Sequence, residues 1–357
     1  MKKLGMLLFM ITSLLLFSKT VLSAPAIELK WANYFPVVAR QSKICEEFIK
    51  DLEARTGGKV KFSYFAAGTL LSPAKMYDGV VEGIADIGFS HIAYTPGRFK
   101  VTEVLDMPLG FPNAWVSNRV VNDFYRKFKP KEWDDVQVIT LHSSPINVMM
   151  TATKPVYKLE DLKGLNIRAV GYIADTVAAL GATPRGLATP ETYDAILKKV
   201  VDGVYIPMET YRAFRFAEVI KYTTECWGIG QQYNFYIVMN KETWKKLPDD
   251  VKKVFNEYPF EEKLATMWNE IDIDGKQLGK EKGIQFITLS PEEEKRWIKA
   301  AETVIEKYVK SMVSAGYPEK EVRGWISFVK ERIDYWTKRQ KELKIKSTTG
   351  PDEVRIK

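Results

Sequence analysis

The sequence predicts an α/β protein built on a mainly parallel β-sheet with helices on both of its faces. The first observation is that short apolar runs alternate along the chain with longer segments whose apolar residues recur at helical spacing. The second is that the last third of the chain is mainly helical, with long amphipathic segments. The third is length, because about 330 residues remain after an apolar leader, which is enough for two domains.

The first 26 residues have the layout of a secretory signal peptide. Two lysines precede an apolar run over residues 4–17, and Ala24-Pro25-Ala26 fits a small-residue cleavage site. The apolar run is short for a membrane span; an uncleaved anchor, and cleavage after Ser23, remain alternatives. No cysteine lies near the cut. We therefore expect a mature protein that is free in a Gram-negative periplasm and not embedded in a membrane.

Strands and helices alternate through the rest of the first two thirds of the chain. Gly57 and Gly58 end the first helix, whereas Pro73 and Pro190 each begin another. The expected strands cover residues 27–32, 59–65, 86–90, 136–141, 165–170, 204–206 and 234–239. The expected helices cover residues 38–55, 72–83, 171–180 and 189–201.

The C-terminal third is predicted to contain long amphipathic helices. One spans residues 248–271, and a strand follows at residues 284–289. Ser290 and Glu293 then form a capping box at the start of the next helix. A last helix is expected after Pro318, and the polar residues at the end of the chain are expected to form a loose tail.

Charge and cysteine content narrow the range of partners. The net charge is +8, and removal of the three lysines in the leader leaves +5. Basic and acidic residues are interleaved, which suits weak attraction of small anions and not a nucleic-acid surface. Cys45 and Cys226 fall in segments that we place in different parts of the fold. Two buried thiols are therefore expected, although a disulfide stays open.

Common catalytic and nucleotide-binding motifs are missing from the sequence, which disfavours an enzyme. It has no G-x-S-x-G, H-E-x-x-H, Walker or G-x-G-x-x-G pattern. The two histidines, His91 and His142, are far apart and have no neighbours at metal-ligand spacing. His142 reads as structural, and His91 is either structural or a ligand contact. We predict no metal and no cofactor.

Arg168 is the most informative single residue. Ligands of parallel α/β sheets bind beyond the carboxyl ends of the strands, where Arg168 ends one strand. Alternation with Leu165 and Ile167 places its side chain among buried or cleft-lining groups, where a charge needs a partner. That partner is either an internal acid or the carboxylate of a ligand, which the planar guanidinium can bind by two hydrogen bonds.

Residues 156–168, VYKLEDLKGLNIR, resemble the signature P-V-x-x-x-E-D-L-K-G-x-x-I-R of the solute-binding proteins of TRAP (tripartite ATP-independent periplasmic) transporters. Further segments resemble the family in the right order and at the right spacing, and together they cover nearly the whole mature chain. They are residues 55–60, 83–87, 179–184, 191–193, 201–207, 216–222 and 240–248.

The resemblance implies a two-domain periplasmic binding protein fold with crossing hinge strands, a ligand cleft between the domains and long C-terminal helices. The implied division is residues 27–145 with 238–275 for the first domain, 146–237 with 276–345 for the second, and a flexible tail at 346–357. It also implies that Arg168 binds the ligand carboxylate.

Departures from the family pattern bear on the ligand. Asn147 stands where many relatives have a second arginine, and residues 204–206 are Val-Tyr-Ile where the family commonly has Gln-Glu-Asn. These changes favour a monocarboxylate with an apolar or aromatic body over a dicarboxylate or sialic acid. Tyr205 replaces an acidic residue that would suit a metal. The predicted ligand-binding residues are Arg168, Asn147, Tyr34, Phe35, Ser90, His91, Tyr172, Pro207, Met208, Glu209, Trp227 and Tyr236.

The sequence therefore predicts reversible capture of a small organic acid and its delivery to the membrane subunits of a TRAP transporter, without chemistry. Two alternatives remain: a periplasmic hydrolase or isomerase on a similar scaffold, and a binding protein for an ATP-driven transporter or a sensor kinase.

Overall fold

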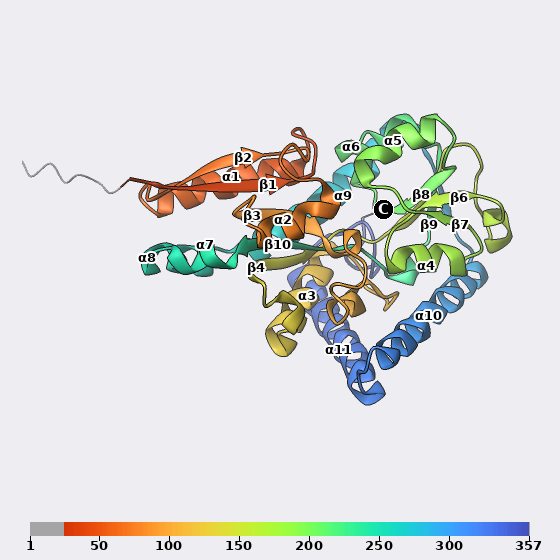
Figure 1. Ribbon diagram of the computed structural model, residues 1–357. Helices are drawn as coiled ribbons and strands as arrows, with labels where there is room; N and C mark the ends of the chain where they lie inside the picture. Colours follow the sequence, from red (N-terminus) through yellow and green to blue (C-terminus); the bar gives the residue numbers. More distant parts are fainter. Residues whose placement is uncertain (1–24, 357) are drawn as a thin grey trace, which may run out of the picture.

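The computed structural model describes residues 25–356, so the predicted signal peptide lies outside it except for its last two residues. The strands of this part form two sheets, and helices surround both of them (Figure 1). The predicted α/β class is confirmed. No helix within residues 25–356 is long and apolar enough to cross a membrane.

The first sheet has five strands in the order β2-β1-β3-β10-β4. They are β1 (Ile27–Asn33), β2 (Val60–Phe65), β3 (Ile87–His91), β4 (Val136–Ser143) and β10 (Asn234–Asn240). β1 runs parallel to β2 and β3, whereas β10 runs antiparallel to β3 and β4. The sheet is mixed and not parallel throughout, because β10 enters it from the other sheet.

The second sheet has six strands in the order β11-β9-β5-β8-β6-β7. They are β5 (Val148–Thr151), β6 (Asn166–Arg168), β7 (Thr183–Arg185), β8 (Gly203–Ile206), β9 (Tyr222–Glu225) and β11 (Gln285–Thr288). The sequence did not reveal β5, β7 or β9. These strands have three or four residues each, which is too short for a periodic pattern to stand out.

Helices cover both sheets. They are α1 (Arg40–Arg55), α2 (Met76–Val81), α3 (Ala114–Phe128), α4 (Tyr172–Ala179), α5 (Thr189–Leu197), α6 (Thr210–Ala213), α7 (Lys241–Lys246), α8 (Asp249–Glu257), α9 (Phe260–Glu281), α10 (Pro291–Ser314) and α11 (Glu319–Leu343). The single helix expected over residues 248–271 is interrupted at Pro259, which has no amide hydrogen to continue a helix. The Ser290 half of the predicted capping box of α10 is confirmed, because Ser290 Oγ accepts from the Glu293 N–H at 3.2 Å. The Glu293 carboxylate does not reach back to Ser290 and instead accepts from the Leu159 N–H and from Arg296.

Two short connections cross between the sheets, and a third, longer crossing runs through α7, α8 and α9 from β10 to β11. Residues 144–147 lead from β4 into β5, and residues 226–233 lead from β9 into β10. Hydrogen bonds join the two connections: Ser144 N–H donates to Tyr233 O at 2.9 Å, and Asn147 N–H donates to Gln231 O at 2.8 Å. The two short connections therefore pass between the sheets as a paired ribbon, and any movement of one sheet against the other has to be accommodated there and along α9.

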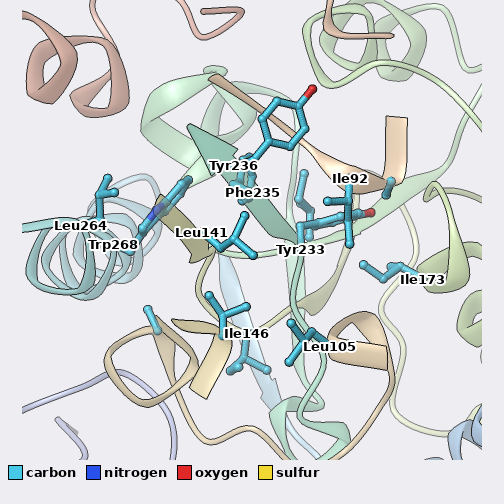
Figure 2. Close-up of a cluster of buried hydrophobic side chains, with 14 of the residues drawn as sticks. Ile92, Leu105, Leu141, Ile146, Ile173, Tyr233, Phe235, Tyr236, Leu264 and Trp268 are labelled. Atoms are coloured by element: carbon cyan, nitrogen blue, oxygen red, sulfur yellow. The ribbon is translucent and has the colours of Figure 1, made fainter. Parts of the chain in front are cut away.

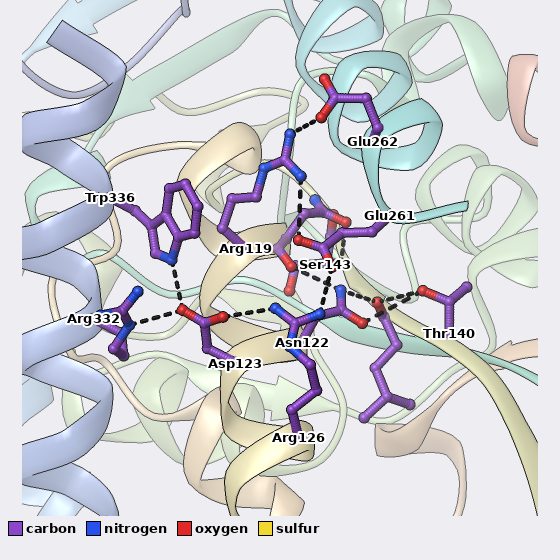
Figure 3. Close-up of polar contacts among 12 residues, drawn as sticks. Arg119, Asn122, Asp123, Arg126, Thr140, Ser143, Glu261, Glu262, Arg332 and Trp336 are labelled. Carbon is purple, nitrogen blue, oxygen red and sulfur yellow. Dashed lines mark hydrogen bonds and ion pairs between the residues drawn. The ribbon is translucent and has the colours of Figure 1, made fainter. Parts of the chain in front are cut away.

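The long helices α9, α10 and α11 brace both sheets. α9 packs on α3 and β4 of the first sheet and on α6 beside the second. α10 packs on α4, whereas α11 returns to α3, where Asp123 accepts hydrogen bonds from Arg332 and Trp336, both at 2.7 Å (Figure 3). α11 thus lies beside the first sheet, although the predicted division grouped it with the second; the domain boundaries themselves stay a prediction.

The two cysteines lie in different parts of the fold, as expected. Cys45 is in α1, and Cys226 follows β9. Both are buried free thiols.

The residues after α11 pack against the protein, so the expectation of a loose tail is wrong for this segment. Ser347, Thr348 and Thr349 are buried. Thr348 Oγ1 pairs with Asp272 on α9, and Thr349 Oγ1 donates to Pro112 O at 2.6 Å. Polar composition misled the prediction, because these hydroxyl groups are buried through hydrogen bonds.

Ending the chain after Ile345 is expected to lower the free energy of unfolding by about 2–4 kcal/mol, because several buried hydrogen bonds are worth about 1 kcal/mol each. Truncation also leaves the buried Asp272 carboxyl without its hydroxyl partner. Urea denaturation of the full and shortened chains measures the difference. Thr348→Val in the full chain is the matched control and should account for part of the loss; an unchanged midpoint on truncation would contradict the packing.

Candidate functional site

A small cavity lies between the two sheets, next to the crossing connections. Its volume is about 10 Å³, close to the least space that holds one water molecule, so side chains of both sheets meet across it. The lining residues come from the ends of strands of both sheets and from the crossing. They are Tyr34, Phe35, His91, Ser144, Thr189, Ile206, Pro207, Glu209, Thr210, Phe214, Tyr233 and Phe235.

A larger groove of about 760 Å³ is less suited to hold a small ligand. It lies beside the C-terminal residues and is open to solvent. Four of its charged groups already have partners, because Lys276 pairs with Glu225 at 3.0 Å and Arg355 pairs with Asp352. The enclosed cavity between the sheets is therefore the candidate site.

Arg168, the last residue of β6, is completely buried and has no acidic partner. Its Nε donates to Leu187 O at 2.9 Å, and its Nη1 donates to the Tyr233 hydroxyl at 3.4 Å. Nη2 has no hydrogen-bond partner. No aspartate or glutamate of residues 25–356 forms an ion pair with Arg168. The internal salt bridge that the sequence left open is not formed, and the guanidinium keeps a buried donor available for an anion.

Asn147 lies in the crossing connection between β4 and β5. Its N–H is held by Gln231 O, which fixes the backbone, and the residue is completely buried. Neither Nδ2 nor Oδ1 of its side chain has a hydrogen-bond partner. Buried amide groups are nearly always paired, so an unpaired one is a candidate ligand contact.

Aromatic rings form one wall of the cavity. The rings of Tyr34 and Phe35 stack at 4.3 Å between centroids, and those of His91 and Tyr94 lie 3.6 Å apart. Burial, together with the charge of Arg168, holds the pKa of His91 well below its usual value. His91 is therefore neutral at pH 7, with an unpartnered Nδ1, and adds polarity without a second charge.

Hydrogen bonds connect the two sheets across this site. Gln41 Nε2 in α1 donates to Glu209 Oε2 beyond β8 at 2.8 Å. The Thr189 N–H at the start of α5 donates to the Tyr94 hydroxyl at 2.9 Å. Close packing adds to these bonds, because a Cβ on Gly171 would lie 2.9 Å from Ala93 Cβ. The two halves are thus in contact around the cavity.

The structure places five of the predicted residues, Tyr34, Phe35, His91, Pro207 and Glu209, in the lining, with Arg168 and Asn147 buried nearby in β6 and the crossing. Ser90 and Tyr236 lie on the other face of the first sheet. Ser90 Oγ donates to Pro73 O at 3.1 Å, and Tyr236 packs among aromatic rings of the core. Figure 2 shows the Tyr236 ring pointing away from the Tyr233 ring.

The three remaining predicted residues lie elsewhere. Met208 is buried, and its carbonyl packs against Gly275 of α9. Tyr172 lines an outer groove and packs edge-on against Tyr308. Trp227 faces the groove near the C-terminal residues.

Sequence reasoning missed several lining residues. Ser144 and Tyr233 belong to the crossing connections, Phe235 lies in β10, and Phe214 follows α6. Gln41 reaches Glu209 from a helix 168 positions earlier in the chain. No local signal in the sequence marked the crossing residues. They line the cavity because the two connections link strands that belong to different sheets.

The polar groups of the site suit an anion better than a metal. No group of three or more His, Cys, Asp or Glu side chains that could hold a metal ion occurs in residues 25–356. The groups that face the cavity or lie beside it are a guanidinium, an amide, a neutral imidazole, hydroxyls and one carboxyl. They can bind a carboxylate and a polar substituent by hydrogen bonds.

Comparison with known proteins identifies the family of this chain and solved structures of similar fold. The model of the bacterial extracellular solute-binding proteins, family 7, matches residues 37–311. A C4-dicarboxylate-binding periplasmic protein of Vibrio cholerae is 24% identical over 74% of this chain and 80% of its own. An open TRAP periplasmic solute-binding protein from Desulfovibrio salexigens is 33% identical, with a TM-score of 0.74 over 87% of this chain and 97% of its own. A TRAP solute-binding protein from Rhodoferax ferrireducens, solved with copurified benzoate, is 23% identical, with a TM-score of 0.83 over 88% and 99%.

Proposed function

Because this chain belongs to family 7 of the bacterial extracellular solute-binding proteins, which serve TRAP transporters, we propose that it binds a small organic monocarboxylate between its two sheets. Proteins of this family are periplasmic and work with the membrane subunits of the transporter. For this chain, export by cleavage of residues 1–26 and delivery of the captured acid to those subunits are part of the proposal.

The observation that carries the proposal is the state of Arg168. A buried guanidinium with no acid beside it is unfavourable on its own, and a visiting carboxylate relieves it. The unpartnered Nη2 supplies a donor for one carboxylate oxygen, and the unpaired Asn147 amide supports a second contact.

The lining supports an apolar or aromatic body for this acid. Apart from Glu209, it offers aromatic rings, Ile206 and Pro207, and hydroxyl groups. The lining contains no arginine, so a second carboxylate of the ligand would have no arginine there to receive it. The benzoate found with the Rhodoferax ferrireducens protein is an acid of the proposed kind.

The proposed mechanism is binding by domain closure, with no bond made or broken. The crossing connections act as the hinge, and the hydrogen bonds of Gln41 with Glu209 and of Thr189 with Tyr94 are contacts of the closed state. A ligand that adds contacts to both halves shifts the equilibrium toward closure. Because the cavity between the closed halves measures about 10 Å³, the lining side chains have to move apart to enclose an acid of this size.

A thermal-shift screen over small organic acids tests this function. Aromatic monocarboxylates such as benzoate and phenylacetate should raise the melting temperature, because a ligand that binds only the folded state stabilises it by mass action. The matched controls are the primary amides, benzamide and phenylacetamide, which keep the body and lose the charge. Equal stabilisation by acid and amide, or none by any acid, would contradict the proposal.

A further inference from the structure

Glu209 is a second buried ionisable group of the cavity. It follows β8, lines the cavity and is 4% exposed. Its Oε2 accepts a hydrogen bond from Gln41 Nε2 at 2.8 Å, and no hydrogen bond of residues 25–356 engages its Oε1. No lysine or arginine in the same part of the chain pairs with it. A carboxyl group that faces a ligand cavity without a cation is unusual, because an unpaired buried charge is costly.

The surroundings of Glu209 favour its protonated form. Burial raises its pKa to about 8; the hydrogen bond from Gln41 lowers it and the nearby Asp272 raises it. Asp272, on α9, has a pKa raised by burial to about 7, with Thr348 and Lys276 acting in the opposite direction. Burial raises the pKa of Tyr34, which follows β1; the nearby Glu209 also raises this pKa, whereas Arg168 lowers it. At neutral pH Glu209 therefore carries a proton, and with Oε2 occupied by Gln41 the free oxygen can hold it.

We propose that Glu209 is a specificity-determining contact that donates a hydrogen bond to an oxygen on the body of the ligand. The preferred ligands are then organic acids with an oxo or hydroxyl substituent, held at their carboxylate by Arg168 and at the substituent by the protonated carboxyl of Glu209. This inference rests on the proposed function and adds the second anchor point. An unsubstituted acid leaves that carboxyl without a partner inside the closed site.

Two other roles of Glu209 lead to different results. If the Gln41–Glu209 hydrogen bond only held the sheets together, it would favour every ligand alike. If Glu209 were ionised, it would select a ligand with an ammonium group and would repel an oxo group. Ligand pairs that differ by one oxygen separate these roles from the proposal.

The experiment is a calorimetric titration of the full mature protein with two ligand pairs at about pH 6.5, below the raised pKa of Glu209. Phenylglyoxylate and phenylacetate differ by an oxo group beside the carboxylate, and 3-hydroxybenzoate and benzoate differ by a hydroxyl far from it. We expect the oxygenated member of at least one pair to bind about tenfold more tightly, as for a buried hydrogen bond of typical strength.

The variants assign that preference to Glu209. Glu209→Met removes the donor at similar volume and should abolish the preference by weakening only the oxygenated member. Glu209→Gln keeps a donor that cannot ionise and should retain it. Gln41→Met is the matched control: it breaks the connection between the sheets and should weaken both members equally.

A pH series on the unmodified protein gives an independent readout. The pKa of Glu209 is raised, so the protonated contact is complete at lower pH and is lost as the pH rises through about 8. The preference for phenylglyoxylate over phenylacetate should decline over that range, because an oxo group only accepts hydrogen bonds, and Glu209→Gln should make it independent of pH.

The outcomes distinguish the two proposals. If the protein binds the plain acids but shows no preference in either pair, or if Glu209→Met retains the preference, this inference is overturned and the proposed function stands. If none of the four acids binds, both are overturned. A preference for the ammonium acid phenylglycine over phenylglyoxylate would also overturn it.

Discussion

Arg168→Ala is expected to weaken binding of the acid that stabilises the protein most in the screen by at least a hundredfold, while the protein stays folded. The charge-assisted hydrogen bond of the buried guanidinium with a carboxylate contributes on the order of 3 kcal/mol, and each factor of ten in affinity corresponds to about 1.4 kcal/mol. Isothermal titration calorimetry measures the loss. The fold should survive because the internal partners of Arg168 are one carbonyl and one hydroxyl.

Two further variants make this result specific. Arg168→Lys keeps the positive charge but loses the planar pair of donors, so it should recover only part of the affinity. Arg185→Ala is the matched control, because Arg185 is the neighbour of Arg168 in the strand register, is exposed and hydrogen-bonds Asn166. Its removal should leave the affinity within about twofold, as expected for a surface group. Unchanged affinity in a folded Arg168→Ala protein would remove the anchor from the proposed site.

Much of this site was predictable because strand ends are visible in the sequence. Predicted ligand-binding residues lie at or just after the ends of β1, β3, β6 and β8, and Tyr34, His91 and Glu209 from three of these places line the cavity. The errors among the predicted site residues arise where the sequence did not show which face of the sheet a side chain occupies. Ser90 and His91 are adjacent, yet one faces the core and the other the cavity, because side chains alternate across a sheet.

Other features depended on contacts between distant parts of the chain. Gln41 carries no local signal that it will meet Glu209, and the polar residues 347–349 gave no sign that α9 and Pro112 would bury them. The expectation that α11 accompanies the second sheet came from the implied division of the chain, whereas its ion pair with Asp123 of α3 is a tertiary contact. Periodicity reports which face of a helix is buried, not against which partner.

Gly230→Ala is expected to lower the free energy of unfolding by about 2–4 kcal/mol and to weaken ligand binding. Gly230 lies in the crossing connection with a φ of +60°, where a side chain is strained at a cost of about 1 kcal/mol. A Cβ there would lie 2.2 Å from Gly110 Cα and 2.3 Å from Phe111 N, both of them backbone atoms that cannot rotate away. Such overpacking typically costs a further 1–3 kcal/mol, approximately.

The loss of binding follows from position, since Gly230 is three residues before Tyr233, whose hydroxyl accepts from Arg168. Gly110→Ala is the matched control, because Gly110 is the other side of the same contact and has a φ of +83°, but its Cβ would meet nothing within 4 Å. It should lose only about 1 kcal/mol, the cost of the left-handed backbone. Urea denaturation and calorimetry of both variants test the comparison. Equal stability of the Gly230→Ala and Gly110→Ala variants would mean that the crossing connections can shift to make room for the added methyl group. The paired ribbon would then not be rigid enough to hold Tyr233 and Arg168 in one arrangement.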